Sequence, residues 1–550
     1  MEISVAAATE AIAAAHPDRD ATVSAGGVRS WQEVSDRTRR LAALLGDAGL
    51  GHHRDTASSE SVSPHDHVAL YLHNGPEYLE GMLGAWKARA ASFNVNYRYV
   101  AAELRYLLDD ASTAAVIFHE CFAPILGPVL DDLRVRPSVL LQVADGSGHA
   151  LLQGAVDYES ALAASTTDLP AELVAGWSGD DLYICYTGGT TGMPKGTMWR
   201  QADFVVSALG VRQRSGAEYQ SMDQLVADAR GTVRALPAAP LMHGAAHWNA
   251  LSCWLAGGTV VIQQVVDRFD PVDILDTIER ERATSLLLVG DPMARPIVDT
   301  LSAERDGGRG RDLSSLRHVL SGGAVLSPRL KSRLVELMAG VTVVDVLGST
   351  ESGRQAVARS RSKDDADASF EPSDSAAVLS SDLSRRLVPG EDELGWLAQS
   401  GRVPLGYLGD EDKSARTFPT VGGTRYAVPG DRARLLEDGR VELLGRDSVC
   451  INTGGEKVFA EEVETAVKAH PAVLDAVVCG RPSERWGEEV VAIVALAEGS
   501  VVTDADLSDA AAATIARYKL PRSFIRVDSV ERAPSGKADY RWARSVAAGD

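Results

Sequence analysis

The segment 186–196 has the residue types and spacing of an anion-binding loop. It reads Tyr-Thr-Gly-Gly-Thr-Thr-Gly-Met-Pro-Lys-Gly and follows the apolar, strand-like run 182–185. Glycines let a backbone bend so that its N–H groups converge on an anion. The threonine hydroxyls add donors and Lys195 adds a positive charge, a combination suited to a phosphate chain. The loop differs from a Walker loop, because Pro194 precedes the lysine and no Ser or Thr follows it.

The length and composition of the chain predict a multidomain globular protein. The chain has 550 residues, which is too long for one compact core. Hydrophobic residues make up 45% and charged residues 24%, as in ordinary soluble proteins. The 55 basic and 76 acidic residues leave a formal net charge of −21, which argues against general nucleic-acid binding. A local basic site for an anionic nucleotide remains compatible with this balance.

The cysteine pattern and the N-terminal segment predict a cytoplasmic location. The five cysteines lie far apart with no CxxC pair, so we expect buried thiols in a reducing compartment. The N-terminus has early acidic residues and lacks the basic start and long apolar core of a signal peptide. No run of about 18 apolar residues occurs, so we expect no transmembrane segment.

Short apolar runs alternate with helical patterns through the first two thirds of the chain. This alternation predicts an α/β fold with a largely parallel sheet. Helical patterns span 30–49, 77–91 and 271–282, and the first opens on Ser-Trp-x-Glu, which is an N-terminal cap signal. The strand-like runs are 68–72, 114–118, 139–143, 259–262, 285–289 and 341–346.

The texture of the sequence changes twice towards the C-terminus. From about Gly401, short β-like pieces with Gly and Pro turns predict a small β subdomain. After Arg446, a helical pattern and two strand-like runs predict a separate α+β domain of about 100 residues. We place the boundary after Gly445, so that 1–445 form the large N-terminal domain and 446–550 the small C-terminal domain.

Further motifs follow the phosphate loop in a set order. They are 238–244 (AAPLMHG), 321–324 (SGGA), 347–351 (LGSTE), 430–431 (GD), 445–447 (GRD), 453–456 (TGGE) and 534–537 (PSGK). Together with the loop, they make the chain resemble the acyl-CoA synthetases of the adenylate-forming superfamily over nearly its whole length. The resemblance implies an adenylation domain for ATP and the acyl group, followed by a small mobile domain that rotates between two poses.

The resemblance also implies the reaction, which is activation of a carboxylic acid. The carboxylate attacks the α-phosphate of ATP to give an acyl-adenylate and pyrophosphate, and the CoA thiol then attacks the activated carbonyl. Both steps bring anions together, so catalysis should depend on positioning and cationic stabilisation rather than on a protein nucleophile. The implied cofactors are ATP, Mg²⁺ and coenzyme A.

The residues that match the family motifs carry implied roles. Those expected to hold the β- and γ-phosphates are Thr187, Gly188, Thr190, Thr191 and Lys195. Those expected at the adenine and acyl site are Gly322, Gly323, Ala324, Gly348 and Ser349. Those expected at the ribose are Asp431 and Arg446, and those beside the pantetheine arm of CoA are Gly454 and Gly455. Thr350 would bond the α-phosphate, Glu351 would hold Mg²⁺, and Lys537 would bridge the substrate carboxylate and the α-phosphate.

Two histidines and the hinge leave alternatives open. A helix would place His243 and His247 on one face, as a zinc pair requires, but Gly244 stands where a zinc hydrolase has Glu. We expect His243 to be a gate or a contact near the acyl carboxylate, whereas His247 either lines the acyl pocket or belongs to the core. The pivot between the domains is either Asp447 or Ser448.

Small side chains after His243 predict a wide apolar acyl pocket. The residues concerned are Gly244, Ala245, Ala246 and Ala250, with Trp248 and Trp254 nearby. Segments 93–98 (FNVNYR) and 447–457 (DSVCINTGGEK) resemble the bacterial branch that acts on long-chain or steroid side-chain acids. We therefore expect a hydrophobic carboxylic acid as the substrate and no nucleic-acid partner, and we leave a homodimer open.

Two other functions remain alternatives. A related ligase would pass the acyl group to a carrier-protein thiol instead of CoA. A non-catalytic nucleotide-binding regulator would keep the fold without the reaction, although Lys195, Glu351, Asp431 and Lys537 are all present. Carboxylate-dependent exchange between ATP and pyrophosphate distinguishes an enzyme from a regulator.

Overall fold

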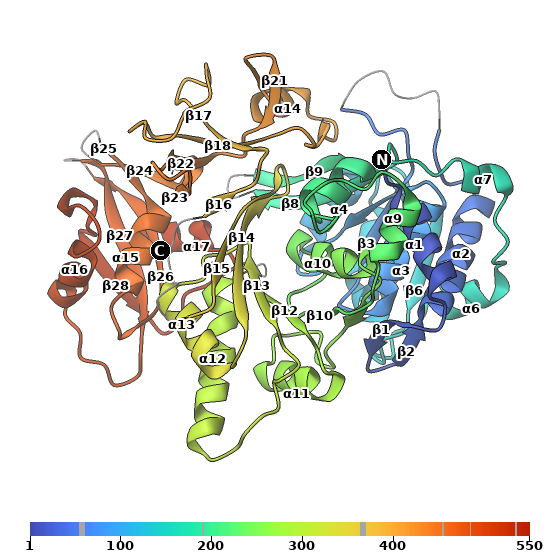
Figure 1. The fold of residues 1–550 in the computed structure, drawn as a ribbon, viewed down its shortest axis with the longest axis horizontal. Coiled ribbons are helices and arrows are strands. Elements are labelled where there is room, and N and C mark those ends of the chain that lie inside the picture. Colours follow the sequence, from blue (N-terminus) through green and yellow to red (C-terminus); the bar gives the residue numbers. More distant parts are fainter. Residues whose placement is uncertain are drawn as a thin grey trace.

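The structure, a computed structural model, describes residues 1–53, 61–189, 192–362, 370–453, 456–483, 486–533 and 536–549. Within these ranges the strands form four sheets (Figure 1). The predicted α/β fold is confirmed: a large N-terminal part with parallel-type sheets is followed by a small β sheet and an α+β C-terminal part.

Two large sheets build the N-terminal part. The first is parallel except at its two edges, and the second is parallel except at one edge. The strands of the first, in spatial order, are β16 (Glu371–Pro372), β15 (Gly353–Ser360), β14 (Thr342–Ser349), β13 (His318–Gly322), β12 (Ser285–Leu288), β10 (Arg234–Pro237), β11 (Thr259–Val261), β1 (Asp20–Ser24) and β2 (Gly27–Ser30). Those of the second are β19 (Gly406–Tyr407), β9 (Gly192–Arg200), β8 (Leu182–Gly189), β4 (Ala91–Asn94), β3 (His67–Tyr71), β5 (Thr113–His119), β6 (Val139–Val143) and β7 (Val156–Asp157).

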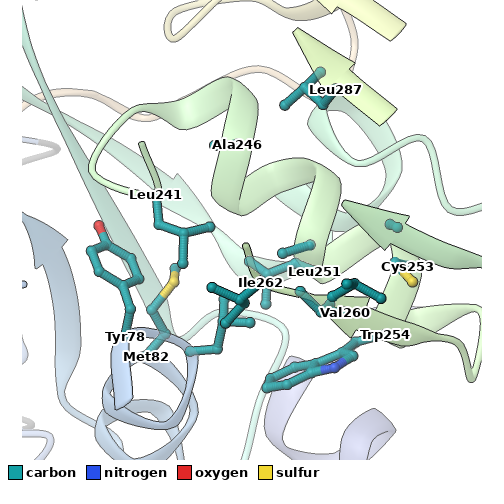
Figure 2. Packing of buried hydrophobic residues seen from close by; sticks show 14 of the residues in the cluster. Tyr78, Met82, Leu241, Ala246, Leu251, Cys253, Trp254, Val260, Ile262 and Leu287 are labelled. Carbon is teal, nitrogen blue, oxygen red and sulfur yellow. The ribbon is translucent and has the colours of Figure 1, made fainter. Parts of the chain in front are cut away.

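The helices of this part cover the sheets and enclose the main core. They are α1 (Val5–Ala15), α2 (Trp31–Asp47), α3 (Pro76–Lys87), α4 (Ala101–Asp110), α5 (Ala123–Asp131), α6 (Tyr158–Ala164), α7 (Ala171–Ala175), α8 (Gln201–Asp203), α9 (Met222–Asp228), α10 (Gly244–Leu255), α11 (Pro271–Glu281), α12 (Gly290–Asp306) and α13 (Pro328–Leu337). Figure 2 shows Tyr78 and Met82 of α3 packed with Leu241 and with Leu251 and Trp254 of α10, all within one buried cluster. This cluster fixes the position of α10, which carries part of the candidate site.

The other two sheets are mainly antiparallel. The small β sheet contains β17 (Ala376–Leu379), β18 (Gly395–Ser400), β20 (Thr420–Val421), β21 (Thr424–Ala427), β22 (Asp431–Leu435) and β23 (Val441–Arg446), with α14 (Glu411–Thr417) nearby. The last sheet contains β24 (Cys450–Thr453), β25 (Glu456–Phe459), β26 (Val473–Ser483), β27 (Gly487–Leu496) and β28 (Ser523–Val527), with α15 (Ala460–Lys468), α16 (Asp504–Ala512) and α17 (Tyr540–Ala548).

The C-terminal part, red in Figure 1, lies beside the orange strands β22 and β23 and the yellow helices α12 and α13. β23 ends at Arg446 and β24 begins at Cys450, so the chain passes into the last sheet through residues 447–449. The domain division after Gly445 stays a prediction. In the part of the chain that the structure describes, no helix is long and apolar enough to cross a membrane.

Local signals predicted some helix ends well and others poorly. Ser30 caps α2 as expected: its hydroxyl accepts from Glu33 N–H, and the Glu33 carboxylate accepts from Ser30 N–H. The helix predicted over 77–91 instead ends at Lys87, and Ala91 already begins β4. The reason is Arg89, whose φ of 58° is left-handed and cannot continue a helix.

Candidate active site

The predicted phosphate loop is the tip of a β-hairpin. β8 and β9 pair antiparallel with Thr187 opposite Lys195, which brings a hydroxyl and an ammonium to the same end of the hairpin. Lys195 Nζ lies 3.2 Å from Asp410 Oδ2. Gly188, another residue predicted to bind phosphate, belongs to β8. The predicted contacts Thr190 and Thr191 lie outside the described residues. The strand runs further into the motif than the sequence predicted, because the pairing with β9 continues past Thr187.

The hairpin of β14 and β15 carries the next charged group. Thr350 and Glu351 form its turn, and Trp199 Nε1 on β9 donates to the Thr350 carbonyl oxygen at 2.9 Å. Tyr407 OH donates to Glu351 Oε1 at 2.8 Å. Among the described residues, no donor bonds the other oxygen of this carboxylate. Glu351 is therefore oriented by Tyr407 and keeps one oxygen for another ligand.

The backbone before this turn is tightly packed. A Cβ on Gly348 would overlap the carbonyl oxygen of Gly353, so only glycine fits there. Ser349 N–H donates to Ser352 Oγ at 3.2 Å, and the two hydroxyls lie 2.9 Å apart. Gly348 and Ser349 thus shape the turn that presents Thr350.

The segment 322–324 lies at the same edge of the sheet. β13 and β14 run parallel with Gly322 beside Val346, so 322–324 and the β14–β15 turn both emerge at the carboxyl ends of parallel strands, where α/β proteins commonly bind ligands. Gly323 is exposed with a φ of 86°, a conformation that glycine adopts without strain, and Ala324 is half-buried.

Asp431 and Arg446 are brought together by β22 and β23. The two residues are register partners, and Arg446 Nε donates to Asp431 Oδ1 at 3.2 Å. Asp431 is buried, and its negative charge raises the pKa of Arg446. Asp447 N–H then donates to the carbonyl oxygen of Gly430 at 3.0 Å, which ties one of the two predicted pivot residues to this strand end.

Lys537 reaches these charges from the far end of the chain. The surrounding protein and the positive charge of Arg446 lower the pKa of Lys537, and the carboxylates of Glu351 and Asp431 act in the opposite direction. The Lys537 side chain is exposed. The charges of Arg446, Glu351 and Asp431, which come from two other segments, are close enough to act on Lys537.

The turn before Lys537 is docked on the large N-terminal part. Gly536 is buried with a φ of 75°, and a Cβ there would come within 3.0 Å of Val289 Cγ1. Lys468 Nζ of α15 lies 3.6 Å from Asp291 Oδ2 of α12, and both side chains are buried. These contacts hold the last sheet in the orientation that brings Lys537 near Glu351.

The two predicted histidines have different environments. Burial and the nearby charge of Lys537 lower the pKa of His243 to about 3, so its imidazole is neutral at physiological pH. Its Nε2 is buried and has no partner among the described residues. His247 is fully buried: Nδ1–H donates to the Leu241 carbonyl oxygen at 2.7 Å, so Nε2 accepts from Tyr183 OH at 2.5 Å. Of the two alternatives for His247, the structure selects the core.

One face of α10 is only half-buried. The half-buried residues, called here the α10 stripe, are Gly244, Ala245, Trp248, Asn249 and Ser252. Ala246 and Trp254 are fully buried in the main cluster (Figure 2). Ala250 is fully buried there too, so the predicted wide pocket is wrong at these three positions. Helical periodicity explains the difference, because residues three to four apart share a face and these point away from the stripe.

Asn94, for which the sequence suggested no role, joins two of the predicted motifs. Its Nδ2 donates to the carbonyl oxygens of Tyr186 and Met242, each at 2.8 Å, and its Oδ1 accepts from Tyr186 N–H at 2.8 Å. Tyr186 begins the phosphate loop and Met242 precedes His243. A polar residue at the end of the buried strand β4 was the available signal, but its partners lie 92 and 148 residues away.

We expect Asn94→Leu to destabilise the protein by a few kcal/mol, because three buried backbone groups would each lose a partner, at about 1–3 kcal/mol per group. The measurement is the thermal unfolding midpoint. Asn96→Leu is the matched control, since Asn96 Oδ1 accepts only one local bond, from Arg98 N–H at 3.0 Å among the described residues. Equal unfolding midpoints for the two variants would contradict the bridging role.

The donor set around Glu351 suits a magnesium ion that shares its ligands with a substrate. In the described part of the chain, no three His, Cys, Asp or Glu side chains are grouped to hold a metal by themselves. Mg²⁺ commonly takes one or two carboxylates and completes its shell with phosphates and water. Glu351, with one oxygen free of described donors, fits that pattern. The predicted CoA contacts Gly454 and Gly455 lie outside the described residues.

The architecture is that of the adenylate-forming enzymes. Two parallel-type sheets, a small β sheet and an α+β end surround a group of charges drawn from distant segments. Solved structures share this fold: the anthranilate CoA ligase AuaEII in complex with anthranoyl-AMP superposes with a TM-score of 0.80 at 21% identity, covering 100% of this chain and 98% of that one.

Sequence comparison identifies the family. The AMP-binding enzyme profile matches residues 9–380, and the AMP-binding enzyme C-terminal domain matches 462–537. The medium-chain acyl-CoA ligase Mig of Mycobacterium avium is 48% identical over 99% of this chain and 98% of that protein. The 3-oxocholest-4-en-26-oate–CoA ligase of Rhodococcus rhodochrous is 38% identical over 96% and 93%, respectively. The chain belongs to the AMP-binding enzyme family, and the predicted resemblance to acyl-CoA ligases is confirmed.

Proposed function

We propose that the protein is an ATP-dependent acyl-CoA synthetase that activates a hydrophobic carboxylic acid as acyl-AMP and transfers the acyl group to CoA. The observation that carries the proposal is the convergence of Lys537, Glu351, Asp431 and Arg446 from distant parts of the chain. An active site for nucleotide and carboxylate needs such a mixture, because cations must offset the anions that react.

In the first step, an oxygen of the substrate carboxylate attacks the α-phosphorus of ATP and pyrophosphate leaves. The Lys537 ammonium offsets the negative charge of the carboxylate and the α-phosphate, and Thr350 bonds that phosphate. Thr187, Gly188, Thr190, Thr191 and Lys195 hold the departing pyrophosphate. His243, which is neutral because its pKa is low, contacts the carboxylate without competing as a cation. Mg²⁺ held by Glu351 would supply further positive charge to the phosphates when bound.

The nucleoside is held beside this centre. Asp431 accepts hydrogen bonds from the ribose hydroxyls, and Arg446 supports that carboxylate through their 3.2 Å contact. The backbone contacts to the adenine come from Gly322, Gly323, Ala324, Gly348 and Ser349.

In the second step, the CoA sulfur attacks the acyl carbon and AMP leaves. Gly454 and Gly455 would let the pantetheine arm pass close to the backbone. Between the steps, the C-terminal domain would rotate about Asp447 or Ser448, withdrawing Lys537 and presenting the segment 453–456.

The acid is proposed to be a medium- or long-chain fatty acid or a steroid side-chain acid. The names and high coverage of the relatives support this class. A cytoplasmic location is proposed because all five cysteines are free thiols. A homodimer stays a prediction.

We expect CoA-dependent AMP release with a panel of hydrophobic acids that includes steroid side-chain acids, with acyl-CoA as the product. Accumulation of acyl-adenylate that never becomes acyl-CoA would instead favour a ligase for a carrier-protein thiol. Absence of ATP–pyrophosphate exchange with the whole panel would favour the non-catalytic regulator.

A further inference from the structure

Asp291, where β12 leads into α12, is bonded to the segment that carries the predicted adenine contacts. This segment, residues 321–327, is called here the adenine segment. Asp291 N–H donates to the Val325 carbonyl oxygen at 2.9 Å, and Asp291 Oδ1 accepts from Ser327 N–H at 2.7 Å. The backbone and one carboxylate oxygen of Asp291 are therefore both fixed to the chain that directly follows residues 322–324.

The backbone at Gly290 brings the two segments into close contact. Gly290 has a φ of 55°, and a Cβ there would come within 2.5 Å of the Val325 carbonyl oxygen and 2.9 Å of Ala324. Its N–H donates to Ser321 Oγ at 3.2 Å. Glycine is required at this contact, and a displacement of the adenine segment would move Asp291 with it.

The second oxygen of the Asp291 carboxylate faces the C-terminal part. Lys468 Nζ, on α15, lies 3.6 Å from Asp291 Oδ2, and both side chains are buried. Among the described residues, Asp291 Oδ2 has no hydrogen-bond partner, and Lys468 is the one cation that forms an ion pair with this carboxylate. Because a buried carboxylate is costly without a nearby cation, Asp291 depends on a charge supplied by the other part of the protein.

Two further contacts join the same regions. Arg329 Nη1, on α13, donates to the carbonyl oxygen of Pro471, just beyond the end of α15, at 2.9 Å. A Cβ on Gly536, the residue before Lys537, would come within 3.0 Å of Val289 Cγ1. Residues 289–291 therefore contact the adenine segment, the side chain of Lys468 and the turn that carries Lys537.

We propose that Asp291 is a positioning residue that couples the adenine segment to the pose of the C-terminal domain through its ion pair with Lys468. The inference rests on the proposed function and adds the regulation of its first step. A nucleotide that orders the adenine segment would hold Asp291 where Lys468 pairs with it, which keeps Lys537 at the reacting anions. Rotation for the second step separates the pair, so the pair stabilises only the pose for the first step.

The first test follows amide hydrogen exchange with and without AMP. In the wild type, we expect AMP to slow exchange in residues 462–471 as well as in the adenine segment, because the ion pair connects them. In Lys468→Met, AMP should slow exchange in the adenine segment alone. Lys519→Met is the matched control: Lys519 also pairs with a carboxylate of α15, that of Glu462 at 2.6 Å, but within the C-terminal part, so the wild-type response should persist.

The second test separates the half-reactions. Asp291→Asn can still accept the bond from Ser327 N–H but loses the charge, and Lys468→Met loses the cation without altering the adenine segment. We expect each variant to lower carboxylate-dependent ATP–pyrophosphate exchange roughly 10-fold. The double variant should lose no more than either single variant, because both substitutions remove the same pair. Thioester formation from supplied acyl-adenylate should persist in all three.

Three results in an active enzyme would overturn the inference while the proposed function stands. They are AMP-dependent slowing of 462–471 that persists in Lys468→Met, losses of ATP–pyrophosphate exchange that multiply in the double variant, and equal losses of both half-reactions in Lys468→Met. A wild type that shows no ATP–pyrophosphate exchange with any acid would overturn both the inference and the proposed function.

Discussion

Lys537→Ala is expected to lower carboxylate-dependent ATP–pyrophosphate exchange by roughly 10²–10³-fold or more, because it removes the one cation proposed to contact both reacting anions. The surrounding protein and the positive charge of Arg446 lower the pKa of this ammonium. A charge that is already in place interacts strongly with an incoming phosphate and needs little reorganisation. Thioester formation from supplied acyl-adenylate should persist, because that step is proposed to use the other pose.

The two half-reactions supply the internal control for this variant. Lys519→Ala removes a lysine of the same domain that already pairs with Glu462 at 2.6 Å and has no proposed role, so the variant should retain both half-reactions. A Lys537→Ala enzyme that loses both half-reactions equally would point to a folding defect or to a different role for the lysine. Exchange rates and thermal unfolding midpoints, measured on the same preparations, separate those two outcomes.

Glu351→Gln is expected to lower exchange by about 10²-fold and to raise the Mg²⁺ concentration needed for half-maximal rate. Glutamine has the shape of glutamate and can still accept the bond from Tyr407 OH, which is 2.8 Å long in the structure. The substitution therefore removes the charge while keeping the turn. Tyr407→Phe, which keeps the charge but loses its orientation, should reduce exchange less, by about 10-fold for one hydrogen bond to a charged group.

Glu371→Gln is the control for the loss of a carboxylate in the same sheet. Glu371 lies on β16, is exposed and pairs with Arg359, so its loss should leave the Mg²⁺ dependence unaltered. If the rate falls in Glu351→Gln while the Mg²⁺ titration keeps its midpoint, the carboxylate acts in another way. Titrations at fixed ATP, with free Mg²⁺ as the variable, provide this comparison.

Several elements were predictable because their signals are local. The capping box at Ser30 and the run 139–143 correspond directly to the start of α2 and to β6. The end of α3 was missed because the left-handed φ of Arg89 has no clear sequence signature. The extension of β8 to Gly189 was missed because it depends on pairing with β9, in a segment whose glycines alone predict a turn.

The sequence by itself determined the family and the candidate chemistry, because the glycine-rich loop and the ordered motifs up to Lys537 are local patterns. Tertiary structure alone decided which side chains meet. It placed His247 and Trp254 in the core and linked the phosphate loop through Asn94 to Met242, the residue before His243. Such facts depend on strand order, register and helix rotation, which bring together residues far apart in the chain and which no single segment encodes.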